Sequence, residues 1–443
     1  MSIARSFTAD ISAVGRCESE RLTFFERAWL LIGIVDIPLG IDSYLMYHEY
    51  DGKLGAVAGL NISLTSFSII VLYWTWMSRA AVARRRGNVK FNFGTYMLFY
   101  ISMVLVSVLV AINPLLTLFD VFLLAQSYLL FFYLANRIQH IGDLYFCVMC
   151  LAAAVLTQAL LIIGMYAVGA AWGQPYEIGP LMLSVSENGR AQGSMHSPIL
   201  AGSTLALFWL PCVALLYCKR VSKLYYVAAL AAVVLGLPAI FATGSRGAIA
   251  SSFVAVILIA VSLLSRNWVR RWALLLAFSL ALLSLYPMYH SISKRFTDDQ
   301  GSAISRVYHA EIAMEMILDE PILGYGAGNS HLAGQRYADQ SKYRAEWYYT
   351  IHNKYLLVWI ETGLLGLVFF LLVLGNGVWQ GFSTWRAGHR SLAVLGIAIS
   401  AALLGHMMHM LVDVFNSPTQ VESLWVMLGL AAATWSISRQ EEL

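Results

Sequence analysis

The stretch LYFCVMCLAAAVLTQALLIIGMYAV, residues 144–168, contains no charged side chain and decides the fold class. At a rise of about 1.5 Å per residue, a helix of this length crosses the hydrocarbon core of a bilayer, which is about 30 Å thick. We interpret its Cys147 and Cys150 as thiols on one face of a buried helix rather than as a redox pair. Hydrophobic residues make up 59% of the 443 residues and charged residues only 12%. Soluble domains carry about 25% charged residues, so these values exclude an ordinary soluble enzyme, a disordered chain and a nucleic-acid binder.

Other apolar runs of spanning length recur along the chain. They lie at 24–40, 61–78, 93–112, 115–135, 144–168, 197–217, 224–243, 247–265, 269–288, 354–375, 391–413 and 421–437. The sequence therefore predicts an all-α, polytopic integral membrane protein with about 12 transmembrane helices. We treat residues 1–443 as a single membrane domain. The first span holds Asp36 and Pro38 and is the weakest prediction of the set.

The basic residues predict the orientation in the membrane. Most of the 29 Lys and Arg residues fall between spans on one side, and most of the others lie in one long loop, residues 289–353. The positive-inside rule then places both termini in the cytoplasm and this loop on the outer side, which is the periplasm if the membrane is the inner membrane of a bacterium. The residues before the first span are expected to form a cytoplasmic tail rather than a signal peptide.

The large periplasmic loop, 289–353, is predicted to contain ordered structure and to form part of the active site. Apolar residues recur at helical spacing over 303–319, so we expect an amphipathic helix that is stopped by Pro321. The sequence GYGAG at 324–328 follows a helix rather than a strand, so it predicts a tight turn rather than a phosphate-binding loop. Aromatic residues in the loop, Tyr325 among them, would supply platforms for sugar rings.

Three of the arginines on the predicted outer side are candidates for binding, and the positive-inside rule disfavours two of them, Arg190 and Arg246, because they lie in short loops. Arg246 lies between two spans that are joined by almost no connecting chain. An arginine at this boundary either snorkels to lipid headgroups or binds an anion, and the flanking glycines favour the anion. Arg190 lies in the preceding outer loop and Arg306 opens the amphipathic helix. Each is either a solvated charge or a further ligand of the same anion.

Histidines supply the second unusual feature of the outer side. His352 closes the large loop directly before the tenth span, where it is either interfacial or functional. His406, His409 and Asp413 lie on one face of the eleventh span near its outer end. Lining of a cavity, structural packing and metal ligation are the alternatives for this set, and the lack of a second cluster disfavours the metal.

Guanidinium groups and an imidazole on the outer face of a membrane protein fit glycosyl transfer. Guanidinium groups stay charged and bind a diphosphate in a bidentate manner. A histidine of near-neutral pKa suits removal of a proton from a hydroxyl. On the outer side of the membrane, the free energy that drives a transfer must be carried by an activated substrate, for example a sugar linked to a lipid diphosphate. Because arginine can replace a divalent cation at the diphosphate, neither a metal nor another cofactor is expected.

The motifs from about residue 186 to 430 together resemble the O-antigen ligase and Wzy-type polysaccharide polymerase superfamily. The matching pieces are Arg190-x-x-Gly193 with His196-x-Pro198, Thr243-Gly244-Ser245-Arg246-Gly247, Ser305-Arg306, Glu320-Pro321-Ile322-Leu323-Gly324-Tyr325-Gly326, His352-Asn353-x9-Gly363-x-x-Gly366 and His409-x-x-x-Asp413. Their order, spacing and predicted side of the membrane carry the resemblance, whereas the first 140 residues contribute little beyond hydropathy.

The resemblance implies a GT-C-type helical bundle in which Arg246, Arg306 and His352 are catalytic. Substrate contacts would come from Arg190, His196, Asn353, Tyr325, His409 and Asp413. It implies a metal-independent, inverting transfer of a glycan from undecaprenyl diphosphate to an acceptor sugar hydroxyl. Such a reaction belongs to exopolysaccharide or lipopolysaccharide biosynthesis, and its partners are the lipid-linked oligosaccharide donor, a glycan acceptor and membrane lipid.

Several functions remain open at this stage. A polymerase is favoured, and a flippase and a chain-length regulator would then be partners. The alternative within the superfamily is an O-antigen ligase that transfers the glycan to the lipid A core. An anion or solute transporter is the alternative of another class, but the exceptional charges lie on one face and no inverted repeat is visible. A purely structural partner in a polysaccharide assembly is the third alternative.

Overall fold

The computed structural model describes residues 21–53, 55–82, 94–172, 176–178, 181–183, 190–272, 279, 302–340 and 350–441, and helices dominate them. In chain order the elements are α2 (Phe24–Leu39), β1 (Asp42–Leu45), α3 (Glu49–Lys53), β2 (Leu60–Ser63), α4 (Leu64–Val82), α5 (Thr95–Val106), the 3-10 helix η2 (Ser107–Val110), α6 (Pro114–Arg137), α7 (Ile141–Trp172), β3 (Tyr176–Ile178), β4 (Leu181–Leu183), α8 (Pro198–Leu215), α9 (Lys223–Ala242), α10 (Arg246–Ser265), α13 (Ser302–Asp319), α14 (Ser330–Gln340), α15 (Lys354–Ala387), α16 (Arg390–His409) and α17 (Pro418–Glu441).

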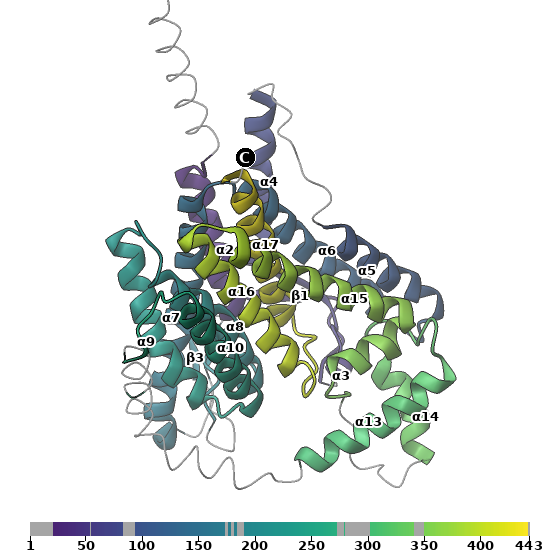
Figure 1. The fold of residues 1–443 in the computed structure, drawn as a ribbon. Helices are drawn as coiled ribbons and strands as arrows, with labels where there is room; N and C mark the ends of the chain where they lie inside the picture. The colour runs from purple at the N-terminus through teal and green to yellow at the C-terminus, as the bar shows by residue number, and fades with distance from the viewer. Residues whose placement is uncertain are drawn as a thin grey trace, which may run out of the picture.

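The predicted polytopic membrane fold is confirmed. Within the described ranges, 8 helices are long and apolar enough to cross a membrane: α6, α7, α8, α9, α10, α15, α16 and α17. The predicted spans at 24–40, 61–78 and 93–112 correspond to α2, α4 and α5 with η2, of which α2 and α5 are shorter. Most of the predicted span at 269–288 lies outside the described residues. α2 begins and α17 ends at the same end of the bundle (Figure 1).

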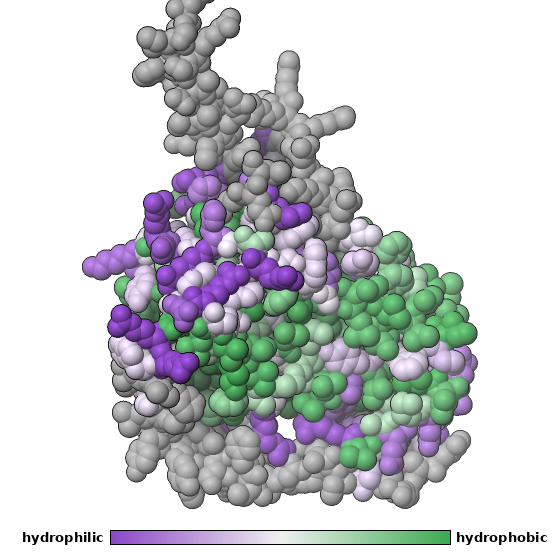
Figure 2. Space-filling view, in the orientation of Figure 1, coloured by the Kyte–Doolittle hydropathy of each residue, from purple (hydrophilic) through white to green (hydrophobic). Residues whose placement is uncertain are grey.

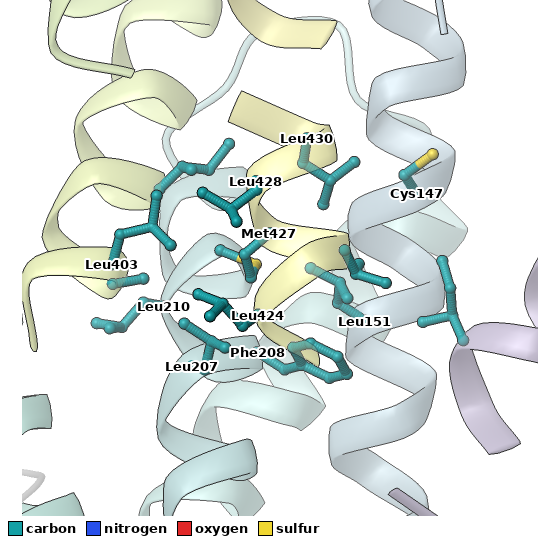
Figure 3. Packing of buried hydrophobic residues seen from close by; sticks show 14 of the residues in the cluster. Cys147, Leu151, Leu207, Phe208, Leu210, Leu403, Leu424, Met427, Leu428 and Leu430 are labelled. Atoms are coloured by element: carbon teal, nitrogen blue, oxygen red, sulfur yellow. The ribbon is translucent and has the colours of Figure 1, made fainter. Parts of the chain in front are cut away.

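The helices divide into a buried centre and an outer layer. In α17 and α8 the apolar spanning segments are 89% and 83% buried, whereas those of α9 and α10 are only 28% and 33% buried. α17 packs against α6, α8 and α15, and leucines from α8, α16 and α17 interlock with α7 (Figure 3). On the face seen in Figure 2, hydrophobic residues form a band with hydrophilic residues above and below it. An apolar surface of this kind is suited to contact with lipid.

The end of the bundle where α2 begins is held together by buried ion pairs. Glu26 is fully buried and lies 2.9 Å from both Arg137 and Arg79. Arg27 pairs with the buried carboxylate of Asp143 at 2.7 Å. These arginines belong to the segments that the sequence assigns to the cytoplasm. Their ion pairs connect α2 to α4, α6 and α7.

The opposite end of the bundle carries α13 and α14, and we call it the loop end (Figure 1). The amphipathic helix expected at 303–319 is α13, which ends before Pro321 as predicted. The all-α expectation needs a small addition, because β1 pairs with β2 and β3 with β4 as short antiparallel hairpins. His331 of α14 contacts Asp51 of α3 at 2.7 Å, so the first hairpin connection and the large loop are joined.

The GYGAG segment docks on a break in α15. Gly363 adopts φ 71°, a conformation that favours glycine, and α15 changes direction there. A Cβ at Gly363 would overlap the carbonyl group of Ile322. The freed carbonyls of α15 are satisfied by the loop, because Tyr325 N donates to Ile360 O at 2.8 Å and Gly326 N to Glu361 O at 3.0 Å. The expectation that these glycines form a turn is therefore confirmed.

Candidate functional site

Arg246 is positioned by the tight connection between α9 and α10. α9 ends at Ala242 and α10 begins at Arg246 itself, with Gly244 at φ 59° between them. Ser245 caps α10, because its hydroxyl accepts from Ala248 N. Arg246 thus adds a guanidinium charge to the positive end of a helix dipole, a combination that favours an anion.

Arg190 lies on the same connection. Its Nε donates to Thr243 O at 2.8 Å, and Ala191 N donates to Ala242 O at 3.3 Å. The side chain of Arg190 runs over Gly244, where an added Cβ would meet its Cγ and Nε at 3.4 Å. The absence of a side chain at Gly244 is what lets Arg190 approach. The loop arginine therefore lies on the connection that carries the helix-terminal arginine, and their binding of one anion stays a prediction.

The end of α16 packs against the start of α10. The ring of His409 lies directly on Gly247, so that a Cβ there would be within 3.0 Å of its Cδ2 and Nε2. On the other side, Arg306 Nε donates to Val412 O at 3.1 Å. The short segment from His409 to Asp413 therefore has the Arg246 connection on one side and α13 on the other.

Asp413 lies within electrostatic reach of two of the arginines. The pKa of Asp413 is raised to about 6, because burial outweighs the opposing effects of a backbone hydrogen bond from Val414 and of the charges of Arg306 and Arg190. Both guanidinium groups therefore lie within electrostatic reach of one buried carboxyl group. A site with this composition holds a net positive charge even when Asp413 is ionised.

His352 lies beside Arg306 and is held there by α16. Lys354 N donates to Met410 O at 2.9 Å and Tyr355 Oη donates to Met407 O at 2.8 Å, which fixes the start of α15 against the end of α16. Burial, together with the nearby His309 and Arg306, lowers the pKa of His352 to about 4, which is below the near-neutral value expected from the sequence. The imidazole is therefore neutral at physiological pH and able to accept a proton.

The three residues predicted to be catalytic thus come from three separate segments that meet at the end of α16. Arg246 precedes the glycine that contacts His409, Arg306 binds Val412 O, and His352 faces Arg306. All three lie at the loop end. The contacts that bring them together join residues far apart in the sequence.

Three other predicted residues have different surroundings. Asn353 caps α15, since its Oδ1 accepts from Tyr355 N and Leu356 N. His196 is exposed and faces Asp42 of β1. Tyr325 Oη lies 2.7 Å from Tyr337 Oη. Tyr325 Oη also donates to Met316 O. Met316 lies ten residues after Arg306, which is roughly 15 Å further along α13. Their roles in substrate binding stay predictions, and their described contacts do not join them to the arginines.

One histidine of this region was missed by the sequence reasoning. His309 lies three residues after Arg306 on α13, is 3% exposed and stacks on His352 with ring centroids 5.4 Å apart and planes 13° apart. The spacing from Arg306 places both on one face of the helix and was the available signal.

The surroundings of His406, His409 and Asp413 bear on whether this set could bind a metal. The rings of His406 and His409 both pack edge-on against Phe415, at centroid distances of 4.6 and 5.1 Å. Across the described ranges, no group of three or more His, Cys, Asp and Glu residues could hold a metal ion. The packing of both rings on Phe415 fits the structural alternative that the sequence left open.

Taken together, the apolar helices and the cationic loop end define a polytopic α-helical membrane protein with a polar site at one end. Residues 200–371 match the family model described as O-Antigen ligase. This range covers less than half of the chain but contains Arg246, Arg306 and His352, and the match supports the predicted resemblance to the O-antigen ligase and Wzy superfamily. No curated protein matches the chain. The match supports an O-antigen ligase/polymerase-type role.

Proposed function

We propose that this protein is a metal-independent, inverting glycosyltransferase that moves a glycan from undecaprenyl diphosphate to a sugar hydroxyl. We favour a polymerase of an exopolysaccharide or O-antigen, and the ligase that acts on lipid A core is the alternative. The observation that carries the proposal is the meeting of a neutral His352 with Arg306 beside the Arg246 connection.

The chemistry assigns each group a role. The acceptor hydroxyl loses its proton to His352 as its oxygen bonds to the anomeric carbon of the donor sugar. The bond from that carbon to the diphosphate oxygen breaks, and the diphosphate leaves with the electron pair. Arg246, Arg306 and Arg190 stabilise the negative charge that develops on the diphosphate. A single displacement of this kind inverts the configuration at the anomeric carbon.

The location of the site supports its proposed placement in the periplasm. The arginines and His352 lie at the loop end, whereas Arg27, Arg79 and Arg137 lie at the opposite end. The positive-inside rule assigns that opposite end, with both termini, to the cytoplasm. Transporters bind substrates near the midplane, so a site at one end of the bundle favours the transferase.

Purified variants and a lipid-linked oligosaccharide repeat test the proposal. Arg246→Ala, Arg306→Ala and His352→Ala should each abolish product while the proteins still insert and elute as single species. Arg306→Lys should remain poor, because lysine cannot form the bidentate fork. Lys223→Ala, at the other end of α9, is the control that should keep full activity. A ladder of products indicates a polymerase, a single transfer to lipid A core indicates a ligase, and near-normal product from all three alanine variants would refute the proposal.

A further inference from the structure

His309 is the buried titratable group closest to the proposed base that the mechanism leaves unused. Its ring is 3% exposed and lies parallel to His352 within 13°, at a centroid distance of 5.4 Å. Ring stacking at this distance and angle restricts rotation of the imidazole that it covers. The stacking partner comes from α13, the helix that also supplies Arg306.

The position of His309 on α13 is fixed independently of His352. Residues 306 and 309 lie on one face of the helix, and Arg306 binds Val412 O at 3.1 Å. At its far end, α13 packs on α14 and α15 through Ile312, Met316 and Ile360. The His309 ring is therefore presented by a helix that is held at both ends, as a positioning group requires.

We infer that His309 is a positioning residue for the proposed base: its stacked ring fixes the plane of the His352 imidazole. This inference rests on the proposed function. His309 would not touch the substrate. It would act by keeping His352 neutral and aimed until the acceptor hydroxyl arrives, after which His352 takes the proton.

The surroundings of His352 define what a pH experiment would measure. Among the residues that the structure describes, the charged and titratable groups that act on it are His309 and Arg306, both on α13. Burial and Arg306 remain when His309 is replaced, so the effect of His309 is a partial one. Asp413 also faces Arg306, but it is unchanged in the variants and contributes equally to every profile.

The test compares His309→Phe and His309→Ala with the wild type over a range from about pH 4 to 8. Phenylalanine keeps a flat ring without charge, so kcat at pH 8 should stay within about three-fold of wild type. The acid limb of its kcat profile should move to higher pH by roughly half a unit or more, because His352 becomes easier to protonate. Alanine also removes the stacking, so kcat should fall about ten-fold or more at every pH with little change in KM.

Two controls make the outcome decisive. His389→Phe, an exposed residue at the opposite end of α16, should leave the profile unchanged, as should Val307→Ala on the exposed face of α13. Unshifted profiles and normal kcat in both His309 variants, with His352→Ala inactive, would overturn the inference and leave the proposed function intact. An active His352→Ala would overturn both. If neither His309 variant elutes as a folded species, His309 is structural and the inference is wrong.

Discussion

Replacement of Gly247 by alanine should disable the site without unfolding the protein. A Cβ at Gly247 would lie under 3.0 Å from Cδ2 and Nε2 of His409, and 3.2 Å from Cε1. Non-bonded carbon atoms prefer separations of about 3.5–4.0 Å, so the ring has to move by roughly 1 Å. The segment that follows this ring binds Arg306 through Val412 O. A displacement of about 1 Å near a reacting group costs on the order of 100-fold in rate.

The thermal stability of Gly247→Ala should change little. Gly247 has ordinary helical geometry, and alanine in a helix is favoured over glycine by up to about 1 kcal/mol, which offsets part of the clash. Gly375→Ala in α15 is the matched control, because a Cβ there meets no atom within 4 Å. We expect Gly247→Ala to lose roughly 100-fold in kcat, with a thermal unfolding midpoint close to wild type. The control should retain full activity.

A double variant shows whether the ring is the cause. In Gly247→Ala with His409→Ala the clash is gone, so the pair should be no less active than His409→Ala alone. The contact between α10 and the end of α16 would be refuted if the double variant lost the product of the two single-variant losses in kcat. It would also be refuted if Gly247→Ala kept the kcat of the wild type.

Three further variants test other parts of the structure by thermal unfolding in detergent. Glu26→Gln leaves the buried Arg137 without its ion pair and should destabilise the protein by about 3–5 kcal/mol; an unchanged midpoint would contradict the burial of this pair. Gly363→Ala has to adopt φ 71° and overlaps the carbonyl of Ile322, so we expect a loss of roughly 3 kcal/mol or failure to fold, and a stable variant would show that α15 is not broken there. The raised pKa of Asp413 means that the folded state binds a proton that the unfolded state lacks between about pH 4 and 6, so stability falls as pH rises through that window. Asp413→Asn should flatten this dependence by up to roughly 2–3 kcal/mol, and an identical slope in wild type and variant would refute it.

Hydropathy and helical periodicity predicted the elements that depend on local sequence. The run at 144–168 is the centre of α7, and the expected helix at 303–319 differs from α13 by one residue. The two hairpins were missed because strands of three or four residues carry no detectable alternation. The burial of the thiols in α7 agrees with the interpretation from sequence.

The site was predicted less completely, because its contacts depend on how distant helices pack. The sequence singled out Arg246, Arg306 and His352 from charge and position, but it could not show that His409 rests on Gly247. It also could not distinguish a tyrosine that reaches a ligand from one whose hydroxyl pairs within the loop, as Tyr325 does. Side-chain identity predicts chemical capacity, whereas the direction in which a side chain points follows from tertiary packing.

The docking of the GYGAG segment on α15 bears on how a long sugar chain gains access. α13 is fastened at its start by Arg306 and just beyond its end by backbone bonds from Leu364, Tyr325 and Gly326 that span the break in α15. A rigid-body movement of α13 away from α15 and α16 would break all of these hydrogen bonds, each of which contributes about 1 kcal/mol. We therefore expect α13 to stay fixed relative to α15 and α16, so that a chain of the proposed glycan substrate would have to enter without displacement of this helix.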